Sequence, residues 1–298
     1  MSTPAPAQTP SAGPPAANPG ETNLAGATYI VKAGDSVYSI ARMFGTTVQA
    51  IVQVNMLSDP SRISAGQGLI IPGLFVTPTP TVSATRAPAV GAKVIRKGNP
   101  NRKMVALTFD VGSDAGYTAM ILDTLKANGV RVSFGMTGVW AERNPDLLKR
   151  IVSEGHHLIN HSYDHFSFTG SATKKPPLTQ AQRWEEVDKA ESIVQALTGA
   201  TTLPYFRPPF GDYDDSVNAD VGARGYQYSI MWSVDSRGWT GIPVPQITQN
   251  VLGGVEPGAI AVLHVGASSQ DGPALQGIID GLRAAGYSIG SVPDVLAP

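Results

Sequence analysis

Side chains suited to acid–base chemistry stand at the ends of several apolar stretches of this sequence. Asp110 ends the run MVALTFD, Asp235 ends YSIMWSVD and His264 ends AVLH. An ionised aspartate can accept a proton and an imidazole can donate one near neutral pH, so together they suit general acid–base catalysis. A single histidine in an apolar strand is more often a packed core residue, so the hypothesis depends on the whole set.

A second set of residues suits a divalent metal ion. The stretch NHSYDH places His161 and His165 four residues apart, a spacing that lets both imidazoles reach one ion from a helix face or from a loop. Neutral imidazole binds zinc and similar divalent metals, and the chain has no cysteine that could offer a thiolate. The glutamate of the zincin motif is absent, so on this stretch alone two surface histidines explain the spacing equally well.

Arginine and aromatic residues accompany both sets. Arg207 lies in YFRPPFG at the end of another apolar stretch, where its guanidinium could hold a carboxylate through a bidentate contact or form a structural ion pair. Trp232 and Trp239 flank Asp235 in MWSVDSRGW. Aromatic rings beside a cleft suit the apolar faces of sugars, although most tryptophans serve in packing.

The elements that must position these residues alternate along the C-terminal part of the chain. From residue 100 onward, seven apolar strand-like runs alternate with helical patterns. This alternation predicts an α/β fold with a parallel sheet that is covered on both faces. Such strands could close into a barrel or remain an open doubly wound sheet. Because the polar residues end several different strands, we expect a (β/α) barrel, whereas an open sheet gathers its site at one switch point.

Composition excludes several classes of function. The chain has 298 residues, a formal net charge of −1 and no cysteine, so it offers no electrostatic footprint for nucleic acid or for an anionic membrane. No stretch is apolar for long enough to span a bilayer. The start of the chain lacks the basic and apolar parts of a signal peptide, so we expect that any export leader precedes this numbering.

Two segments rich in proline, alanine and threonine separate the better-patterned regions. Residues 1–26 have almost no large apolar side chains and are expected to be disordered, and residues 74–99 are expected to be an extended linker. Between them, residues 27–73 show a strand, two helical patterns and a second short strand. The sequence therefore predicts a small domain at 27–73 and a large one at 100–298.

The small domain carries a family resemblance. Its pattern YIVKAGDSVYSIARMFGTTVQAIVQVN, followed by ISAGQGLIIP, resembles a LysM domain over the whole length of that family. The resemblance implies a βααβ fold and binding of N-acetylglucosamine-containing glycans, peptidoglycan or chitin, through the loops after the first strand and the second helix. A single module of this kind can also act as a weakly binding spacer. The residues of the two loops are Gly34, Asp35 and Ser36, and Met56, Leu57 and Ser58.

The large domain carries a second resemblance. The stretches TFDVG, HSYDH, RPPFG, DSRGW and VLH follow one another as do the five motifs of the polysaccharide deacetylases, the carbohydrate esterase family with the NodB homology domain. The resemblance spans about residues 100–298. It implies a distorted (β/α) barrel, a divalent metal, usually zinc with cobalt as an alternative, and hydrolytic removal of N-acetyl groups from glycans.

The resemblance also implies acid–base roles for the matching residues. Asp110 would be the general base that takes a proton from water, and Arg207 would hold it in its ionised form. His264 would be the general acid that protonates the departing sugar amine. Asp235 belongs to the fourth motif and is expected in the same catalytic set.

Metal and substrate contacts follow from the same resemblance. His161 and His165 would bind the metal, which would activate the water and polarise the acetyl carbonyl. The backbone N–H of Phe210 would help to stabilise the oxyanion. Phe210 and Trp239 are therefore the expected substrate-binding residues of the barrel.

The first motif departs from the family pattern at the position after the base. The family has a second aspartate there as a metal ligand, whereas this chain has Val111, which leaves two histidines where a catalytic zinc usually has three protein ligands. Gly112 lets the chain turn, so we expect Asp114 to reach back as the third ligand. The alternative is that Asp114 caps the helix that begins near Gly116.

The fourth motif departs as well. The family usually has an aspartate directly before the tryptophan, where it tunes the acid histidine, and this chain has Gly238 at that position. His264 would then lack its usual partner unless Asp235 or Asp188 reaches it.

Together these features predict an exported, monomeric enzyme that is associated with the cell wall and removes N-acetyl groups from peptidoglycan or, as the second choice, chitin. Two alternatives stay open. The first is a glycan-binding cell-wall protein whose degenerate barrel no longer catalyses, which Val111 and Gly238 favour. The second is an O-acetyl polysaccharide esterase that uses the same residues, against which the LysM resemblance argues.

Overall fold

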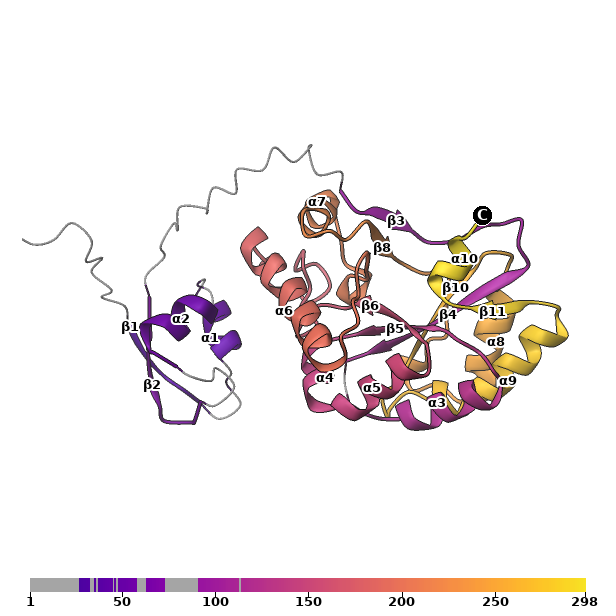
Figure 1. Ribbon diagram of the computed structural model, residues 1–298, viewed down its shortest axis with the longest axis horizontal. Helices are drawn as coiled ribbons and strands as arrows, with labels where there is room; N and C mark the ends of the chain where they lie inside the picture. The colour runs from indigo at the N-terminus through magenta and orange to yellow at the C-terminus, as the bar shows by residue number, and fades with distance from the viewer. Residues whose placement is uncertain are drawn as a thin grey trace, which may run out of the picture. The chain divides into compact units, whose positions relative to one another are not determined.

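The computed structural model describes residues 27–32, 35, 37–44, 46, 48–57, 63–72, 91–112 and 114–298. The chain divides into two compact units, Met1–Ser83 and Ala84–Pro298 (Figure 1). Residues 1–26, expected to be disordered, and residues 74–90 of the expected linker lie outside the described residues. Within the described ranges, no helix combines the length and the apolar character needed to cross a membrane.

The N-terminal unit has the predicted strand–helix–helix–strand plan. Its two strands pair antiparallel, with Tyr29 opposite Leu69. Ile40, Ile51 and Leu69 are buried and form the centre of a small core. The elements are β1 (Ala27–Ile30), α1 (Val37–Met43), α2 (Val48–Val54) and β2 (Gly68–Ile71).

A nine-stranded sheet organises the large unit, in the order β3-β8-β7-β6-β5-β4-β10-β9, with β11 paired to β4. All of its strand pairs are parallel, as the alternation of apolar runs and helices predicts. The strands are β3 (Lys93–Ile95), β4 (Met104–Val111), β5 (Ser133–Met136), β6 (His157–Asn160), β7 (Tyr205–Phe206), β8 (Tyr228–Ile230), β9 (Val234–Asp235), β10 (Ile260–His264) and β11 (Ser288–Gly290).

The sheet curls, so that side chains from distant strands meet inside it. Ile95 of β3, Ile159 of β6, Ile230 of β8 and Ile260 of β10 belong to one buried cluster, together with Val295 of the short helix α10 (Val292–Leu296). The two end strands of the pairing order, β3 and β9, are not paired to each other among the described residues. The predicted distorted (β/α) barrel is confirmed in this half-open form.

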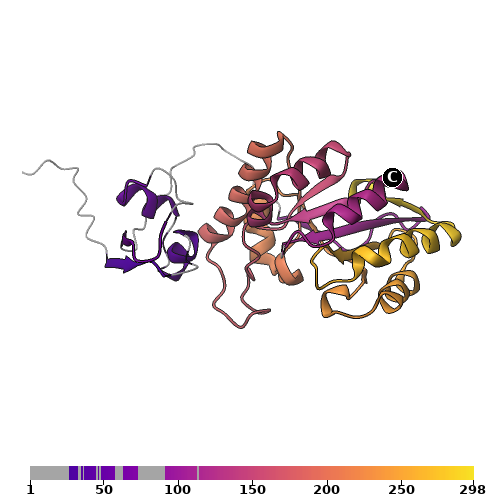
Figure 2. The ribbon, with the colours of Figure 1, turned by 90° about the horizontal axis from the view of Figure 1, so that it is seen from below.

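Helices flank the outer side of the sheet (Figures 1 and 2). Alternation along β4 decides which side chains meet them: Leu107 and Phe109 pack with Ile121 and Leu275 in the main core, whereas Asp110 points to the other side. The helices are α3 (Thr118–Ala127), α4 (Gly138–Arg143), α5 (Pro145–Ser153), α6 (Gln180–Thr198), α7 (Asp215–Ala223), α8 (Val244–Gly254) and α9 (Asp271–Ala284).

The structure corrects the expected linker, which ends earlier than residue 99. Lys93–Ile95 forms β3, parallel to β8, and its Ile95 is buried. The stretch KVIRK is too short and too polar to predict a strand by itself, and hydrogen bonds from the β8 region complete it: the N–H of Met231 donates to the carbonyl of Ile95. The other additional strand arises because YSIMWSVD divides into β8 and β9.

Candidate active site

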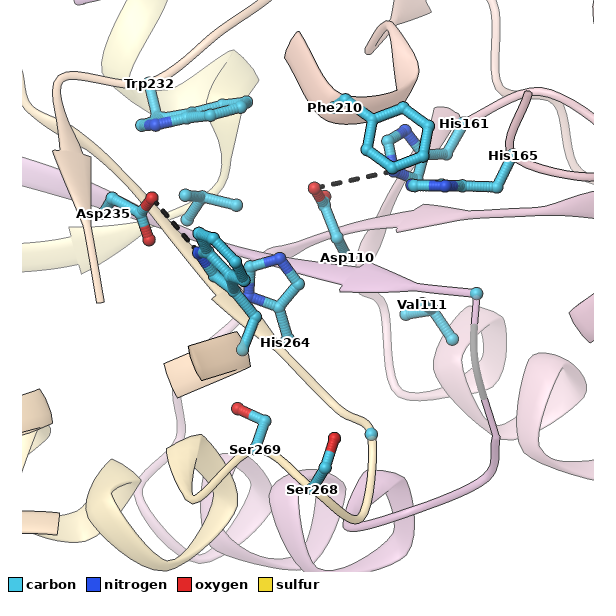
Figure 3. A pocket seen from close by; sticks show the side chains of 14 residues that line it. Asp110, Val111, His161, His165, Phe210, Trp232, Asp235, His264, Ser268 and Ser269 are labelled. Carbon is cyan, nitrogen blue, oxygen red and sulfur yellow. Dashed lines mark hydrogen bonds and ion pairs between the residues drawn. The ribbon is translucent and has the colours of Figure 1, made fainter. Parts of the chain in front are cut away.

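The register of neighbouring strands brings the predicted acid–base residues to one edge of the sheet. His264 lies opposite Asp110 where β10 pairs with β4, and Asp235 lies opposite Val262 where β9 pairs with β10. These ends of the strands line a cavity of about 580 Å³ (Figure 3). Its polar and aromatic lining includes Asp110, His161, His165, Phe210, Asp235, Trp239 and His264. The structure therefore places most of the predicted site residues around one cavity.

Asp110 is held by a buried arginine. Arg207 follows β7 and is fully buried; its Nη1 donates to Asp110 Oδ1 at 2.6 Å and its Nε donates to the carbonyl of Ile230 at 3.0 Å. Burial, the largest single effect, would raise the pKa of Asp110, but the charge and hydrogen bond of Arg207 together with the neighbouring His161 and His264 outweigh it, and the pKa lies below its usual value. Asp110 is therefore an ionised carboxylate that faces the cavity and can accept a proton.

His161 directs an unprotonated nitrogen towards that carboxylate. Its Nδ1 lies 2.8 Å from the carbonyl oxygen of Arg207, which only accepts hydrogen bonds, so we assign the proton to Nδ1. Burial lowers the pKa of His161, although the Asp110 charge acts in the opposite direction, and the ring is neutral. Its Nε2 then lies 3.6 Å from Asp110 Oδ2, with a lone pair on each atom (Figure 3). The unprotonated Nε2 of His161 is therefore available to a cation beside the Asp110 carboxylate.

His165 joins this group from a loop, not from a helix. Ser162 and His165 both have positive φ, and the Ser162 hydroxyl accepts a bond from the His165 N–H at 3.0 Å. The His165 ring centroid lies 4.8 Å from that of His161 and 4.5 Å from that of Phe210. Burial lowers the pKa of His165 to about 3, so this imidazole is also neutral. The four-residue spacing left helix and loop open, and the structure shows the loop.

A buried glutamate of α6 supports the loop between the two histidines. Glu186 is fully buried, and its Oε2 accepts the backbone N–H groups of Tyr163 at 2.8 Å and Asp164 at 3.1 Å. Burial raises the pKa of Glu186 to about 7. Sequence reasoning missed this residue, because a glutamate within TQAQRWEEVDKAES has the appearance of an ordinary exposed helix residue.

The structure does not bring Asp114 to the two histidines. Its side chain is exposed, and its Oδ1 accepts the N–H of Ala267 at 3.0 Å. It does not cap a helix either, since α3 has Tyr117 at its N-cap and no side-chain cap bond. Val111 is fully buried in the core. Across the described part of the chain, no three histidine, aspartate or glutamate side chains converge as a metal-ligand set. The two imidazoles fit two positions of a divalent site, and a third ligand from Asp114 stays a prediction.

His264 has a neighbour that the motifs did not reveal. Asp271, the first residue of α9, accepts the His264 backbone N–H at 2.9 Å, and its Oδ2 lies 3.9 Å from His264 Nδ1. Burial raises the pKa of Asp271, against the hydrogen bonds that it receives. Asp188, one of the two expected partners, instead pairs with Arg224 at 2.6 Å. The other, Asp235, accepts the Arg237 N–H at 2.7 Å.

Two exposed aromatic side chains stand at the mouth of the cavity. Phe210 is 51% exposed and Trp239 is 57% exposed, although both are large apolar groups. Phe210 packs beside His165, and the indole Nε1 of Trp239 lies 3.5 Å from Asp235 Oδ2. Exposed rings beside a polar cavity suit the apolar face of a sugar.

The predicted glycan contacts of the N-terminal unit are only partly described. Gly34, Ser36 and Ser58 lie outside the described residues. Asp35 accepts the Tyr29 hydroxyl and the Lys32 N–H, both at 2.7 Å, so its carboxylate holds the start of its loop. Leu57 is partly buried against the small core. The glycan-binding role of these residues stays a prediction.

A parallel half-open barrel that collects an aspartate, an arginine and histidines at the ends of its strands defines a class of carbohydrate-active hydrolases. This chain belongs to the polysaccharide deacetylase family: the sequence model of that family, described as "Polysaccharide deacetylase", matches residues 97–229. The description "LysM domain" matches residues 29–72. Both resemblances seen in the sequence are thereby confirmed.

The relatives of this chain include named deacetylases and a pseudoenzyme. Peptidoglycan-N-acetylmuramic acid deacetylase PdaA of Bacillus subtilis is 34% identical over 202 residues, which cover 67% of this chain and 73% of that protein. A peptidoglycan-N-acetylglucosamine deacetylase of Bacillus cereus is 32% identical and covers 66% and 89%. The crystal structure of a carbohydrate esterase family 4 pseudoenzyme of Bacillus anthracis is similar with a TM-score of 0.63, at 29% identity and 70% coverage of each chain.

Proposed function

We propose that this chain is a divalent-metal-dependent deacetylase that removes N-acetyl groups from the N-acetylglucosamine-containing glycan of the bacterial cell wall. Peptidoglycan is the preferred substrate and chitin the second choice, because the two deacetylases described above are named for peptidoglycan. The LysM domain supports the same substrate class, since tethering a glycan-binding module raises the effective concentration of the catalytic unit at the polymer. The protein acts outside the cell or in its wall, as a monomer.

The observation that carries this proposal is the pairing of Asp110 and His264 across two strands in register at the wall of one cavity. Amide hydrolysis needs a base that takes a proton from water and an acid that gives one to the leaving nitrogen. Asp110 is ionised and fixed by Arg207, which suits the base. His264 reaches the same cavity from the adjacent strand, which suits the acid.

The residues of the chain divide the reaction between them. Asp110 accepts a proton from the attacking water, whose oxygen adds to the acetyl carbonyl carbon. His264 then donates a proton to the sugar nitrogen as the carbon–nitrogen bond breaks, which releases acetate and the free amine. The exposed rings of Phe210 and Trp239 hold the sugar at the mouth. Solvent afterwards returns both catalytic groups to their starting protonation states.

A divalent cation, zinc first and cobalt second, is proposed as the cofactor of this site. His161 Nε2 and His165 would hold it, because burial keeps both rings neutral. When bound, it supplies Lewis-acid polarisation of the carbonyl and of water. Asp114 is the proposed third ligand, and it would have to exchange the Ala267 N–H for the metal.

Metal content tests the ligand proposal directly. Asp114→Asn keeps an oxygen for the Ala267 N–H but removes the charge that binds metal. We expect its zinc affinity to fall by about 10- to 100-fold, measured by competition with a chromophoric chelator. His161→Ala should lose the metal altogether. Wild-type metal content and activity in Asp114→Asn and Asp114→Ala would show that Asp114 only ties two loops together.

A second candidate function is glycan binding without catalysis. Its specific support is the buried, apolar Val111 at the position after the base, together with the pseudoenzyme among the similar structures. In that case the cavity would still bind an N-acetyl sugar, but the chain would release no acetate. Against this candidate stands the intact Arg207–Asp110 contact and the presence of His264 in register with it.

Acetate release separates these candidates. The full chain is incubated with peptidoglycan, chitooligosaccharides and acetylated xylan, after chelation and after addition of zinc or cobalt, with Asp110→Asn as the matched inactive control. We expect acetate from the N-acetylated glycans, only with metal. Release from xylan alone would indicate an O-acetyl esterase. No release from any substrate, with metal bound and glycan retained on a pull-down, would favour the binding protein.

A further inference from the structure

Two buried polar atoms beside the acid histidine are complementary and have no hydrogen-bond partner. One is Nδ1 of His264, a ring nitrogen that can donate, and the other is Oδ1 of Asp271, which can accept. They belong to neighbouring side chains: the other oxygen of the same carboxylate, Oδ2, is 3.9 Å from Nδ1. A buried donor and acceptor left unpaired cost stability, so a small rotation of the imidazole that joins them is favourable.

The Asp271 carboxylate is fixed in place while the imidazole is free to adjust. Asp271 is fully buried, and its Oδ2 accepts the His264 N–H at 2.9 Å and the Ser269 hydroxyl at 2.6 Å. Ser236 donates a further hydrogen bond to the carboxylate. The His264 side chain is 28% exposed and lines the cavity. The histidine can therefore move by the small amount needed, whereas the carboxylate cannot.

The glycine before Trp239 leaves the space that this carboxylate occupies. A Cβ atom at Gly238 would lie 2.4 Å from Asp271 Oδ2 and 2.6 Å from Ser269 Oγ, so no larger residue fits there without displacing the buried carboxylate. Position 238, in the turn Gly238–Thr240, and Asp271, at the start of α9, thus point into one small volume. Only one of them can supply a side chain to it, and in this chain it is Asp271.

We propose that Asp271 is the positioning residue of His264: its carboxylate accepts the Nδ1–H of the imidazole and holds Nε2 towards the cavity. The carboxylate also stabilises the imidazolium that exists before proton transfer. His264 then gives the Nε2 proton to the sugar nitrogen and keeps the Nδ1 proton, which remains bonded to Asp271. The kinetic consequences of this inference rest on the proposed deacetylase function. The hydrogen bond between Asp271 and His264 does not depend on that function.

A purely structural role for Asp271 predicts different results. In that case the carboxylate would only hold the loop through the His264 backbone N–H and Ser269, and its charge would not matter to the imidazole. The other titratable groups around His264 are Asp110, His161, His165 and Asp235, which all stay unchanged in the test. A change confined to the Asp271 charge therefore isolates its effect on His264.

The first test removes the charge of the Asp271 side chain and keeps its shape. Asp271→Asn keeps the size of the side chain and one acceptor oxygen. We expect kcat for acetate release to fall by about 100-fold with little change in KM, and the alkaline limb of the kcat profile to move by about one pH unit towards acid. A structural role predicts an unshifted profile. Unchanged kcat and an unchanged profile in a folded Asp271→Asn would overturn the proposal.

A swap of the two positions provides the rescue. Asp271→Ala removes the carboxylate, and Gly238→Asp in that background returns one from position 238 once the Ser269 hydroxyl has rotated away from the new Cβ atom. We expect kcat of the double variant to be at least about tenfold higher than that of Asp271→Ala alone. Gly238→Asn with Asp271→Ala has the same shape without charge and should regain nothing. Equal recovery by both double variants would show that packing alone matters.

Nitrogen-15 NMR of the histidine rings gives a readout that needs no activity. In the wild-type protein we expect His264 to carry its proton on Nδ1, with a strongly hydrogen-bonded downfield proton signal that Asp271→Asn removes. A wild-type ring protonated only on Nε2 at neutral pH would overturn the proposal, even if the variants do not fold. Should the wild-type chain release no acetate at all, the deacetylase proposal fails, and this measurement still decides the contact.

Discussion

The two sides of the pocket hold their catalytic groups in different ways. On the base side, which comprises Asp110, Arg207, His161, His165 and Phe210, the Asp110 carboxylate receives a 2.6 Å bond from a fully buried guanidinium. On the acid side, which comprises His264, Asp271, Gly238, Asp235 and Trp239, the imidazole is 28% exposed and 3.9 Å from its carboxylate. The base is fixed before a substrate arrives, whereas the acid still has one hydrogen bond to form.

This difference follows from what each side has to do. A base that must stay ionised gains from a permanent opposite charge, and Arg207 cannot lose its proton in a protein. The acid must be protonated before the transfer and neutral after it, so a partner that fixed the imidazolium as firmly as Arg207 fixes the Asp110 carboxylate would oppose the loss of the proton. Catalytic hydrogen bonds of this second kind often tighten only once the substrate is bound.

The largest effect should come from removing the fixed partner of the base. Arg207→Ala leaves the Asp110 carboxylate buried without its ion pair, which should lower the free energy of unfolding by about 3–5 kcal/mol. Urea denaturation monitored by circular dichroism measures this loss. Acetate release should fall to background, because Asp110 then either takes up a proton or moves.

An exposed ion pair in the same unit is the matched control. Arg224 pairs with Asp188 at 2.6 Å, but the two side chains are 40% and 42% exposed. Arg224→Ala should therefore cost at most about 1 kcal/mol and leave acetate release unchanged. Similar losses in the two variants would mean that burial of the Arg207–Asp110 pair is not what fixes the base.

Most of the base side could be predicted from the sequence, and so could His264, Asp235 and Trp239 of the acid side, but not its carboxylate Asp271. Asp110, His161, His165 and Arg207 stand in short stretches at strand ends, and parallel strands bring such ends together. Asp271 lies in QDGPALQG, where an aspartate at the start of a helical pattern has an ordinary explanation. Its role depends on how α9 packs against β10, which no local pattern contains.

The fold shows the same limit. Long apolar runs predicted the strands from β4 to β10, because burial on both faces leaves a strong pattern. β3 was not predictable, since Lys93–Ile95 has only two large apolar residues and depends on hydrogen bonds from the β8 region. Asp114 is a comparable case: the chain can turn at Gly112, but the N–H of Ala267, which donates to the Asp114 carboxylate, lies on a distant loop that the sequence does not place.

A smaller effect should follow from the glutamate that supports the base side. Burial raises the pKa of Glu186 from its ordinary 4.5 to about 7, so the folded protein binds this proton more tightly than the unfolded chain. The associated stability is present below about pH 4.5 and is lost as the pH rises through 7, a change of about 3 kcal/mol. Glu186→Gln keeps an acceptor for the Tyr163 and Asp164 N–H groups and removes this dependence of the free energy of unfolding on pH.

The measurement is the difference between variant and wild type in unfolding free energy from pH 4.5 to 7.5. Burial lowers the pKa of both His156 and His157 to about 4, so the stability that these two neutral rings contribute is lost as the pH falls below 6.5. Their contribution therefore changes with pH in the opposite direction to that of Glu186. Because it is the same in variant and wild type, subtracting the two free energies of unfolding removes it. We expect the variant to become relatively more stable as the pH rises. A constant difference across this range would show that Glu186 is ionised in the folded protein and that the loop is held by charge.

The smallest effect should distinguish the two aromatic rings at the mouth, one on each side. Trp239 is 57% exposed, so Trp239→Ala should raise KM for a chitooligosaccharide by roughly 5-fold, about 1 kcal/mol, with kcat unchanged. Phe210 also packs on His165, with ring centroids 4.5 Å apart, so Phe210→Ala should lower kcat as well. Met120→Ala, an exposed apolar residue of α3, is the control and should change neither constant. If both ring variants change KM alone, the contact of Phe210 with His165 does not contribute to kcat. The two rings would then act only in substrate binding, and the two sides of the mouth would not differ.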